Sequence, residues 1–162
     1  MSFSQFLTIA LLAMLPITEI QGAIPFFLAT RPDLPALFIL ISAVTGAMVP
    51  PALLLKLLPI VTNRLHDYLH FKPESRLRFV QQTMDWFYHR IHQKHSKAFE
   101  RFGALALILI TGIPLALPGS GVWTGSVLAF LFQIPYQRAL LFMFLGTLFS
   151  GMILTGLWNT LF

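Results

Sequence analysis

Long apolar blocks, separated by short polar segments, constrain the fold of this chain more than any other feature of the sequence. They cover residues 3–30, 35–61, 102–135 and 139–162. The second and fourth blocks are close to the roughly 20 to 25 residues that a membrane-spanning helix needs. Composition agrees, because 56% of the residues are hydrophobic and only 10% are charged, against about 45 to 50% and about 25% in soluble domains. We therefore predict an all-α integral membrane protein, with residues 1–162 forming a single membrane domain.

The first and third blocks differ from the other two because helix-breaking residues lie near their middle. In the third block, the stretch ALPGSGVWTG at 116–125 would carry a straight helix through one proline and three glycines. The interruptions are Pro16, Glu19, Gln21, Gly22 and Pro25 in the first block, and Pro118, Gly119, Gly121 and Gly125 in the third. The prolines and glycines among them end or bend helices, and Glu19 and Gln21 interrupt the apolar run with polar side chains. We expect each of these blocks to form a broken or re-entrant helical hairpin that enters and leaves on one side.

The two halves of the chain resemble each other. The matching pairs are Pro35 with Pro135, Gly46 with Gly146 and, after a shift of one position, Gly22 with Gly121. Each half then consists of a broken hairpin followed by one transmembrane helix, over residues 1–61 and 102–162. An odd number of crossings on each side of the connecting segment inverts the second half, a plan that recurs in transporters. We expect two inverted repeats with both termini outside.

A basic linker, residues 62–101, joins the halves. Eight of the eleven Lys and Arg residues lie between Arg64 and Arg101, which places the linker in the cytoplasm under the positive-inside rule. Apolar residues recur every three or four positions over 76–102, so we predict an amphipathic helix that contacts anionic lipid. The alternative is an ordinary solvated helix packed on the bundle. The net charge of +5 reflects this topology, and we expect no nucleic-acid partner.

The sequence contains little evidence for a metal site, a cofactor site or an enzyme active site. The histidines all lie in the linker, at positions His66, His70, His89, His92 and His95. No pattern of carboxylates completes a metal site there, and the basic neighbours disfavour a cation. Cysteine is absent, as are a Gly-Lys-Ser or Gly-Lys-Thr phosphate loop, an HExxH helix and a GxSxG turn. We expect no metal, no cofactor and no enzymatic activity.

Glu19 is the only acidic residue well inside an apolar block. An ionisable group there costs about 2.5 to 3.5 kcal/mol on membrane-insertion scales, so such groups usually face a cavity or a partner. One interpretation makes Glu19 a proton carrier in coupled transport. The other places it at a shallow depth, where it caps the free N–H groups of the break that begins at Thr18. The sequence supports both interpretations equally.

The stretch 116–125 offers groups for binding a ligand. Backbone amides around Gly119 and Gly121 are candidates for an anion-binding nest at a helix start, with Ser120 and Thr124 supplying hydroxyl groups. Trp123 is a candidate for stacking on a ligand or for anchoring at the membrane interface. The alternative is that the glycines only make a tight turn or permit close helix packing.

Three stretches of the chain resemble one family of membrane proteins: EIQGAIP (19–25), ERFGALALIL (100–109) and IPLALPGSGVWTG (113–125). They are similar to the small multi-drug export proteins of prokaryotes, which carry an ELRGAIP-like motif in the first half and a PLPGTGAWTG-like motif in the second. The resemblance covers most of the chain. The family also looks distantly similar to DedA-type proteins, whose paired re-entrant hairpins are linked to translocation of polyprenyl-phosphate and other lipids.

The resemblance carries over residue by residue. The matching positions are Glu19, Gly22, Ala23, Ile24 and Pro25 in the first motif, and Pro118, Gly119, Gly121, Trp123, Thr124 and Gly125 in the second. Gln21 departs from the motif, since the family usually has a basic residue there. If that cation pairs with the glutamate or holds an anionic substrate, its role is lost or relocated in this chain. Ser120 replaces a threonine and keeps its hydroxyl group.

The residues and the resemblance together lead us to expect a small transporter or exporter in the cytoplasmic (inner) membrane, proton-coupled through Glu19. Two broken helices would line its substrate path, through Glu19, Gln21, Gly22, Pro25, Pro118, Gly119, Ser120, Gly121, Trp123 and Thr124. One alternative is a flippase for polyprenyl-phosphate-type lipids, whose phosphate the loop amides and Ser120 would receive. The other is a membrane scaffold that does not transport.

The expected partners are membrane lipids and a small-molecule or lipid substrate. Two spans and two hairpins are few to enclose a path, which favours a homodimer. Residues 46–51 and 146–151 offer small-residue surfaces on which helices of two copies would meet.

Overall fold

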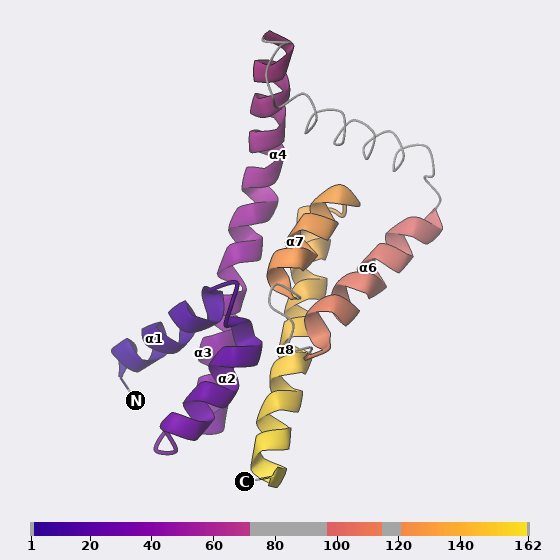
Figure 1. The fold of residues 1–162 in the computed structure, drawn as a ribbon. Helices are drawn as coiled ribbons and strands as arrows, with labels where there is room; N and C mark the ends of the chain where they lie inside the picture. The colour runs from indigo at the N-terminus through magenta and orange to yellow at the C-terminus, as the bar shows by residue number, and fades with distance from the viewer. Residues whose placement is uncertain (1, 72–96, 115–120, 162) are drawn as a thin grey trace.

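The computed structural model describes residues 2–71, 97–114 and 121–161. This part of the chain is helical and contains no strand (Figure 1). Its first half comprises α1 (Phe3–Met14), α2 (Glu19–Thr30), α3 (Ala36–Ala47) and α4 (Val49–Phe71), and its second half α6 (Lys97–Gly112), α7 (Val122–Leu131) and α8 (Tyr136–Leu161). The all-α prediction is confirmed for these residues. Most of the linker helix predicted at 76–102 lies outside them, as do Pro118, Gly119 and Ser120.

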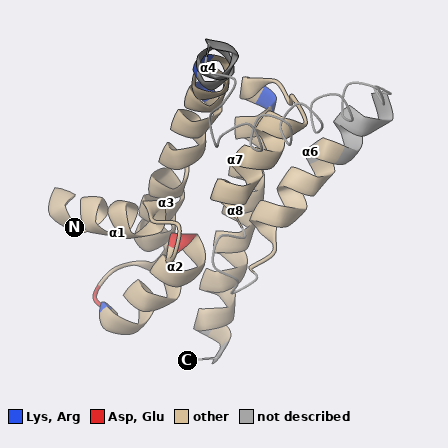
Figure 2. Cartoon of the chain, turned by 45° about the horizontal axis from the view of Figure 1, so that its top comes forward, with Lys and Arg blue, Asp and Glu red and all other residues tan. Residues whose placement is uncertain are grey.

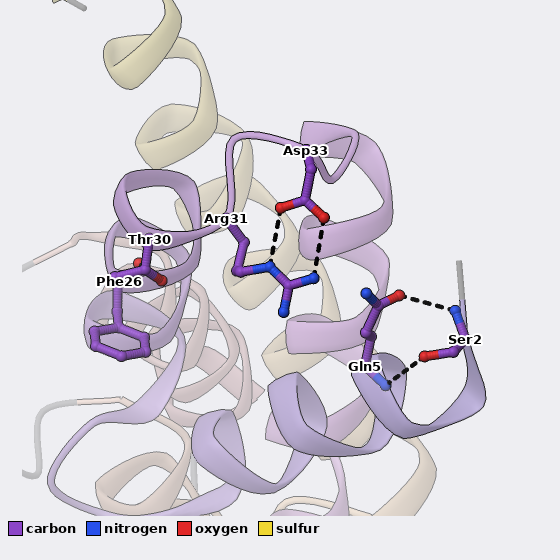
Figure 3. Close-up of polar contacts among 6 residues, drawn as sticks. All are labelled: Ser2, Gln5, Phe26, Thr30, Arg31 and Asp33. Carbon is purple, nitrogen blue, oxygen red and sulfur yellow. Dashed lines mark hydrogen bonds and ion pairs between the residues drawn. The ribbon is translucent and has the colours of Figure 1, made fainter.

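Local sequence determines both ends of α1. At its start the Gln5 N–H donates to Ser2 Oγ at 3.3 Å, and the Ser2 N–H donates to Gln5 Oε1 at 2.8 Å (Figure 3). This reciprocal pair is a capping box. At the other end Leu15 has an extended backbone (φ −73°, ψ 141°), because a residue that precedes proline, here Pro16, avoids the helical region. The first helix break therefore occupies residues 15–18.

A short loop, residues 31–35, joins α2 to α3. Arg31 holds Asp33 with two hydrogen bonds, Nε to Oδ1 at 2.9 Å and Nη2 to Oδ2 at 3.0 Å (Figure 3). Pro35 is the N-cap of α3, and Pro135 likewise precedes α8, because proline is well tolerated where a helix begins. The pair of prolines matched between the two halves of the sequence therefore marks equivalent helix starts.

Two helical stretches are long and apolar enough to cross a membrane. Ala36–Arg64, with only Met48 between α3 and α4, contains an 18-residue segment with a mean hydropathy of 2.1, and Tyr136–Trp158 in α8 contains one with 2.0. Their exposed faces carry large apolar side chains, including Leu53, Leu57, Ile60, Val61, Leu141, Leu145, Phe149 and Met152. The charges that Figure 2 shows lie in the upper part of the view and at the loop between α2 and α3, apart from an acidic position at the start of α2.

Within each half, the first helix packs on the long helix, α1 on α3 and α6 on α8. The matched glycines make both crossings tight. A Cβ atom at Gly46 would collide with the backbone of Ala10, and one at Gly146 would collide with the Thr111 side chain. Small residues let helices approach this closely. The two halves therefore use equivalent positions for equivalent contacts.

The small residues predicted to form a homodimer surface pack inside the chain instead. Gly46, Gly146 and Gly151 are all buried, and a Cβ atom at Gly151 would press on Leu40. These glycines contact other helices of the same molecule, so they do not form a surface for a second copy. A homodimer remains a prediction, and its interface would have to lie on another surface.

Between the halves the packing is reciprocal. The second helix of each half lies on the long helix of the other, α2 on α8 and α7 on α4. In Figure 1, α4 and α8 run in opposite chain directions, and α2 and α7 extend oppositely from the middle of the molecule. Buried apolar residues form two clusters, one around α1, α2 and α3, and one that joins Leu55 of α4 to α6, α7 and α8. Because α2 packs on α8 and α7 packs on α4, the starts of α2 and α7 lie close together.

Candidate functional site at the junction of the helix breaks

The two helix breaks meet through one buried carboxyl group. The backbone N–H of Val122 donates a hydrogen bond to Glu19 Oε1 at 2.6 Å, across 103 residues of sequence. The backbone amide of Trp123 also hydrogen-bonds this carboxyl group. Glu19 is the first residue of α2 and Val122 the first of α7, so a side chain from the first half of the chain caps a helix of the second half. We call Met14, Glu19, Gly121, Val122 and Trp123 the junction.

The N-terminus of α7 explains why a carboxylate is favourable here. The first N–H groups of a helix have no partner inside it, and the helix dipole places partial positive charge there. Gly121, the N-cap residue, has no side chain that could bond these groups, and no side-chain cap bond is present. Glu19 supplies the acceptor instead, from the other half of the chain.

Gly121 is required by the closeness of this contact. A Cβ atom on Gly121 would collide with both carboxyl oxygens of Glu19 and with its Cδ. The backbone of Gly121 is extended (φ 166°), which any residue can adopt, so space and not conformation demands glycine at this position. Gly121, interpreted from the sequence as part of an anion-binding nest or of a tight turn, thus allows the acid to reach the helix start.

Glu19 itself has an uncommon backbone. Its φ is 43°, in the left-handed region that residues other than glycine rarely adopt. Such conformations cost on the order of 1 to 3 kcal/mol and cluster at functional sites. The side chain is only 4% exposed. Glu19 therefore sits in a strained, buried position that directs its carboxyl group at α7.

The end of α1 completes the junction. The indole Nε1 of Trp123 donates to the carbonyl oxygen of Met14 at 3.3 Å. The Thr18 hydroxyl donates to the carbonyl oxygen of Leu12 at 2.5 Å. The last carbonyl groups of a helix lack partners inside it, and lipid cannot supply any. The irregular backbone of the first break is therefore satisfied by protein groups, one of which comes from the second break.

The structure brings only some of the predicted site residues together. Glu19, Gly121 and Trp123 form the junction. Gln21, Gly22 and Pro25 lie in the first two turns of α2, and Thr124 is exposed on α7. The capping interpretation of Glu19 was right about the kind of contact and wrong about the partner, because Glu19 caps α7 and not its own break.

Two residues of the junction were missed at the sequence level. Met14 contributes only a backbone carbonyl and Val122 only a backbone N–H, so their side-chain types carry no signal. Their positions at the end of α1 and the start of α7 were the one available clue, since helix ends expose such groups.

Comparison with known proteins identifies the family of this chain. A family model described as "Putative small multi-drug export protein" matches residues 19–153. The match begins at Glu19 and includes α7 and most of α8, so it contains most of the junction. Searches among curated proteins and among solved structures gave no match. The chain belongs to the small multi-drug export protein family, and it is a membrane protein.

Proposed function

We propose that this protein is a small proton-coupled exporter of a prokaryotic cytoplasmic membrane, in which Glu19 exchanges a proton and the junction lines the substrate path. The observation that carries the proposal is the hydrogen bond from the Val122 N–H to Glu19 Oε1. It places the one acidic group of the apolar blocks at the contact between the two halves. A proton bound there therefore acts on the contact that holds the halves together.

The charge of Glu19 has few partners. Neither α1, α2, α3 nor α7 contains another residue with a titratable side chain. The positive end of α7 is thus the compensating group that the structure offers to a charged Glu19. Hydrogen bonds to charged groups contribute about 1.5 to 3 kcal/mol, against about 0.5 to 1.5 kcal/mol for neutral ones. Protonation of Glu19 weakens its hold on α7 by that difference.

In our proposal, the weaker hydrogen bond between protonated Glu19 and α7 leads to alternating access. The long helices run in opposite directions in Figure 1, and each half packs its second helix on the other half, as in a pair of inverted repeats. Loosening the junction lets the halves move relative to each other and exposes the path to the opposite side. The basic linker would lie in the cytoplasm with both termini outside.

Glu19→Gln tests the proton step with little structural change. The amide oxygen can still accept from the Val122 N–H, but the group no longer ionises. Purified protein in liposomes with an imposed pH gradient, ethidium as the transported probe and an internal pH dye gives both fluxes. We expect wild-type protein to move ethidium and protons together and the variant to lose both, with a melting temperature that falls much less than in Glu19→Ala. Coupled flux in the variant would exclude Glu19 as the proton carrier.

Water access to the breaks tests the path. The chain has no cysteine, so single cysteines at Ile17, which is 81% exposed, and at Thr124 report on the first break and on α7. Ala13→Cys, at a buried position, is the control. An impermeant thiol reagent applied to intact cells and to inverted vesicles should label the first two and spare the third. Protection of Ile17→Cys and Thr124→Cys from both sides would contradict a water-filled path.

The two alternative functions are outcomes of these experiments. A flippase would move a fluorescent polyprenyl-phosphate analogue between leaflets without any soluble substrate. Its phosphate would have to displace Glu19 from the Val122 N–H, which the carboxyl group already occupies. A scaffold would keep its cellular role in Glu19→Gln and show no flux in liposomes.

A further inference from the structure

Buried hydroxyl groups on these helices mostly bond within their own helix. Ser42, Thr111, Ser126 and Thr155 each donate to the carbonyl oxygen four residues earlier, at 2.6 to 2.7 Å. Thr147 and Ser150 of α8 differ. Both are 0% exposed, and neither hydroxyl oxygen has a hydrogen-bond partner in the described part of the chain. Because a buried polar group without a partner is costly, we expect a polar group to lie against them.

The register of α8 places these two hydroxyl groups beside the junction. A Cβ atom at Gly125, three residues into α7, would lie 3.2 Å from Met143 Cε. A Cβ atom at Gly151 would lie 3.1 Å from Ile20 Cδ1, in the residue that follows Glu19. Residues three or four apart share a helix face. Thr147 and Ser150 therefore lie on the α8 face between these two contacts, one with α7 three residues after Val122 and one with the residue that follows Glu19.

We propose that Thr147 and Ser150 bind water that connects them to the Glu19 carboxyl group, and that this water is the route by which a proton reaches Glu19. The inference rests on the proposed function. Each hydroxyl group can donate one hydrogen bond and accept others, and buried waters typically make two to four bonds to such groups. A hydronium ion in this water gives one proton to the Glu19 carboxylate, leaving a neutral carboxylic acid and a water molecule. Release reverses the step.

Among the helices that the structure describes, ionisable residues other than Glu19 stand at sequence positions away from this site. On α8 the only ones are Tyr136 and Arg138, in its first turn. On α6 they are confined to its first five residues, which precede Thr111 by more than two turns. In α4 the first ionisable residue is Lys56, and the residues from Val49 up to Lys56 carry none. Hydroxyl groups and water, and not a second charge, are thus the groups available to pass a proton to Glu19.

Infrared difference spectroscopy of the purified full-length protein in lipid tests this route without any substrate. Acidification should produce the C=O stretching band of a protonated carboxyl group, and Glu19→Gln, which lacks the carboxyl group, identifies the band. In the double variant Thr147→Val with Ser150→Ala we expect the band to shift to higher frequency, because its hydrogen bonds weaken. We also expect its exchange with D2O to slow. Ser126→Ala, which loses a hydroxyl group bonded within α7, is the control and should leave both properties unchanged.

Each outcome has a distinct meaning. A Glu19 band that is unchanged in the double variant overturns the water route and leaves the proposed function intact. The absence of any Glu19 band down to acid pH overturns proton exchange at Glu19, and the route with it. Thermal unfolding of the double variant shows whether it still folds. Its apolar replacements have a similar shape and remove hydroxyl groups that have no protein partner in the described part of the chain, so the melting temperature should stay the same or rise. A large fall would show that the hydroxyl groups serve the fold instead, and would overturn the proposal.

Discussion

The first helix break, residues 15–18, is bridged mainly by hydrogen bonds among its own neighbours, whereas the start of α7 is completed by a side chain from the other half of the chain. Across the first break the Glu19 N–H bonds the Leu15 carbonyl at 2.9 Å and the Gly22 N–H bonds the Thr18 carbonyl at 2.6 Å, so helical bonding nearly continues. After the second break, the Val122 N–H depends on the side chain of Glu19. The starts of α2 and α7 therefore differ in which groups satisfy their backbone N–H groups.

This difference locates the chemistry. Helix order, prolines at helix starts and glycines at crossings are common to both halves, but an acid is not: in the register that matches Gly22 with Gly121, the second half has Pro118 where the first has Glu19. A shared fold therefore carries one carboxyl group that acts between the halves. Four predictions follow from comparing the breaks, beginning with the largest expected effect.

The matched glycines should respond in opposite ways to a methyl group. Gly121→Ala places a Cβ atom on the Glu19 carboxyl group, and we expect a loss near the upper end of the roughly 1 to 3 kcal/mol typical of overpacking. At Gly22 the nearest atom to a Cβ would be Thr18 Cβ at 3.4 Å, an ordinary contact. Gly22→Ala should therefore gain about 0.5 to 1 kcal/mol, since alanine suits a helix interior better. Unfolding in detergent by chemical denaturant measures both, and equal losses would refute the asymmetry.

Removing the carboxyl group should expose the dependence of α7 on the other half. Glu19→Ala leaves the buried Val122 N–H without its acceptor, and we expect a loss of about 1 to 2 kcal/mol, as for other helix caps. Glu19→Gln keeps an acceptor and should lose much less. Hydrogen exchange at the start of α7, followed by mass spectrometry, should rise in the alanine variant only. Unchanged exchange there would mean that Glu19 does not cap this helix.

The bonds to the end of α1 should make smaller and similar contributions. Trp123→Phe removes the indole donor to Met14, and Thr18→Val removes the hydroxyl donor to Leu12. Each should cost about 0.5 to 1.5 kcal/mol, the usual value of one hydrogen bond. Denaturant unfolding of both variants and of their combination gives the comparison. A cost above that of Glu19→Ala would show that the α1 end, and not the α7 start, holds the junction together.

The smallest expected effect is a difference in pH dependence between the loop after α2 and the loop after α7. The hydrogen bond from Arg31 lowers the pKa of Asp33 below its ordinary value. The pair therefore stabilises the fold above the pKa of an unfolded aspartate, about 3.9, and this small contribution is lost as the pH falls through the lower folded pKa. The equivalent loop, residues 132–135, has no ionisable side chain. Asp33→Asn should abolish this acid dependence of the melting temperature, and its persistence would assign it to other groups.

Much of the fold could be predicted from short stretches of sequence. The apolar blocks predicted the two long helices, and Pro16 was among the residues expected to interrupt the first block. Pro35 and Pro135, noted in the sequence only as a match between the halves, directly precede α3 and α8. These features depend on helical bonds between residues four apart and on the backbone limits of proline. Glu19 could be singled out because a lone acid in an apolar block is costly.

The tertiary structure alone decided what Glu19 does. Its partner lies 103 residues away and is a backbone N–H, which every residue except proline possesses. Only the packing of α2 on α8 and of α7 on α4 brings the acid to the start of α7. The same packing explains why Gly121 must lack a side chain and why Trp123 reaches Met14. Local sequence sets where helices start and stop, while contacts between distant helix ends depend on how whole helices pack.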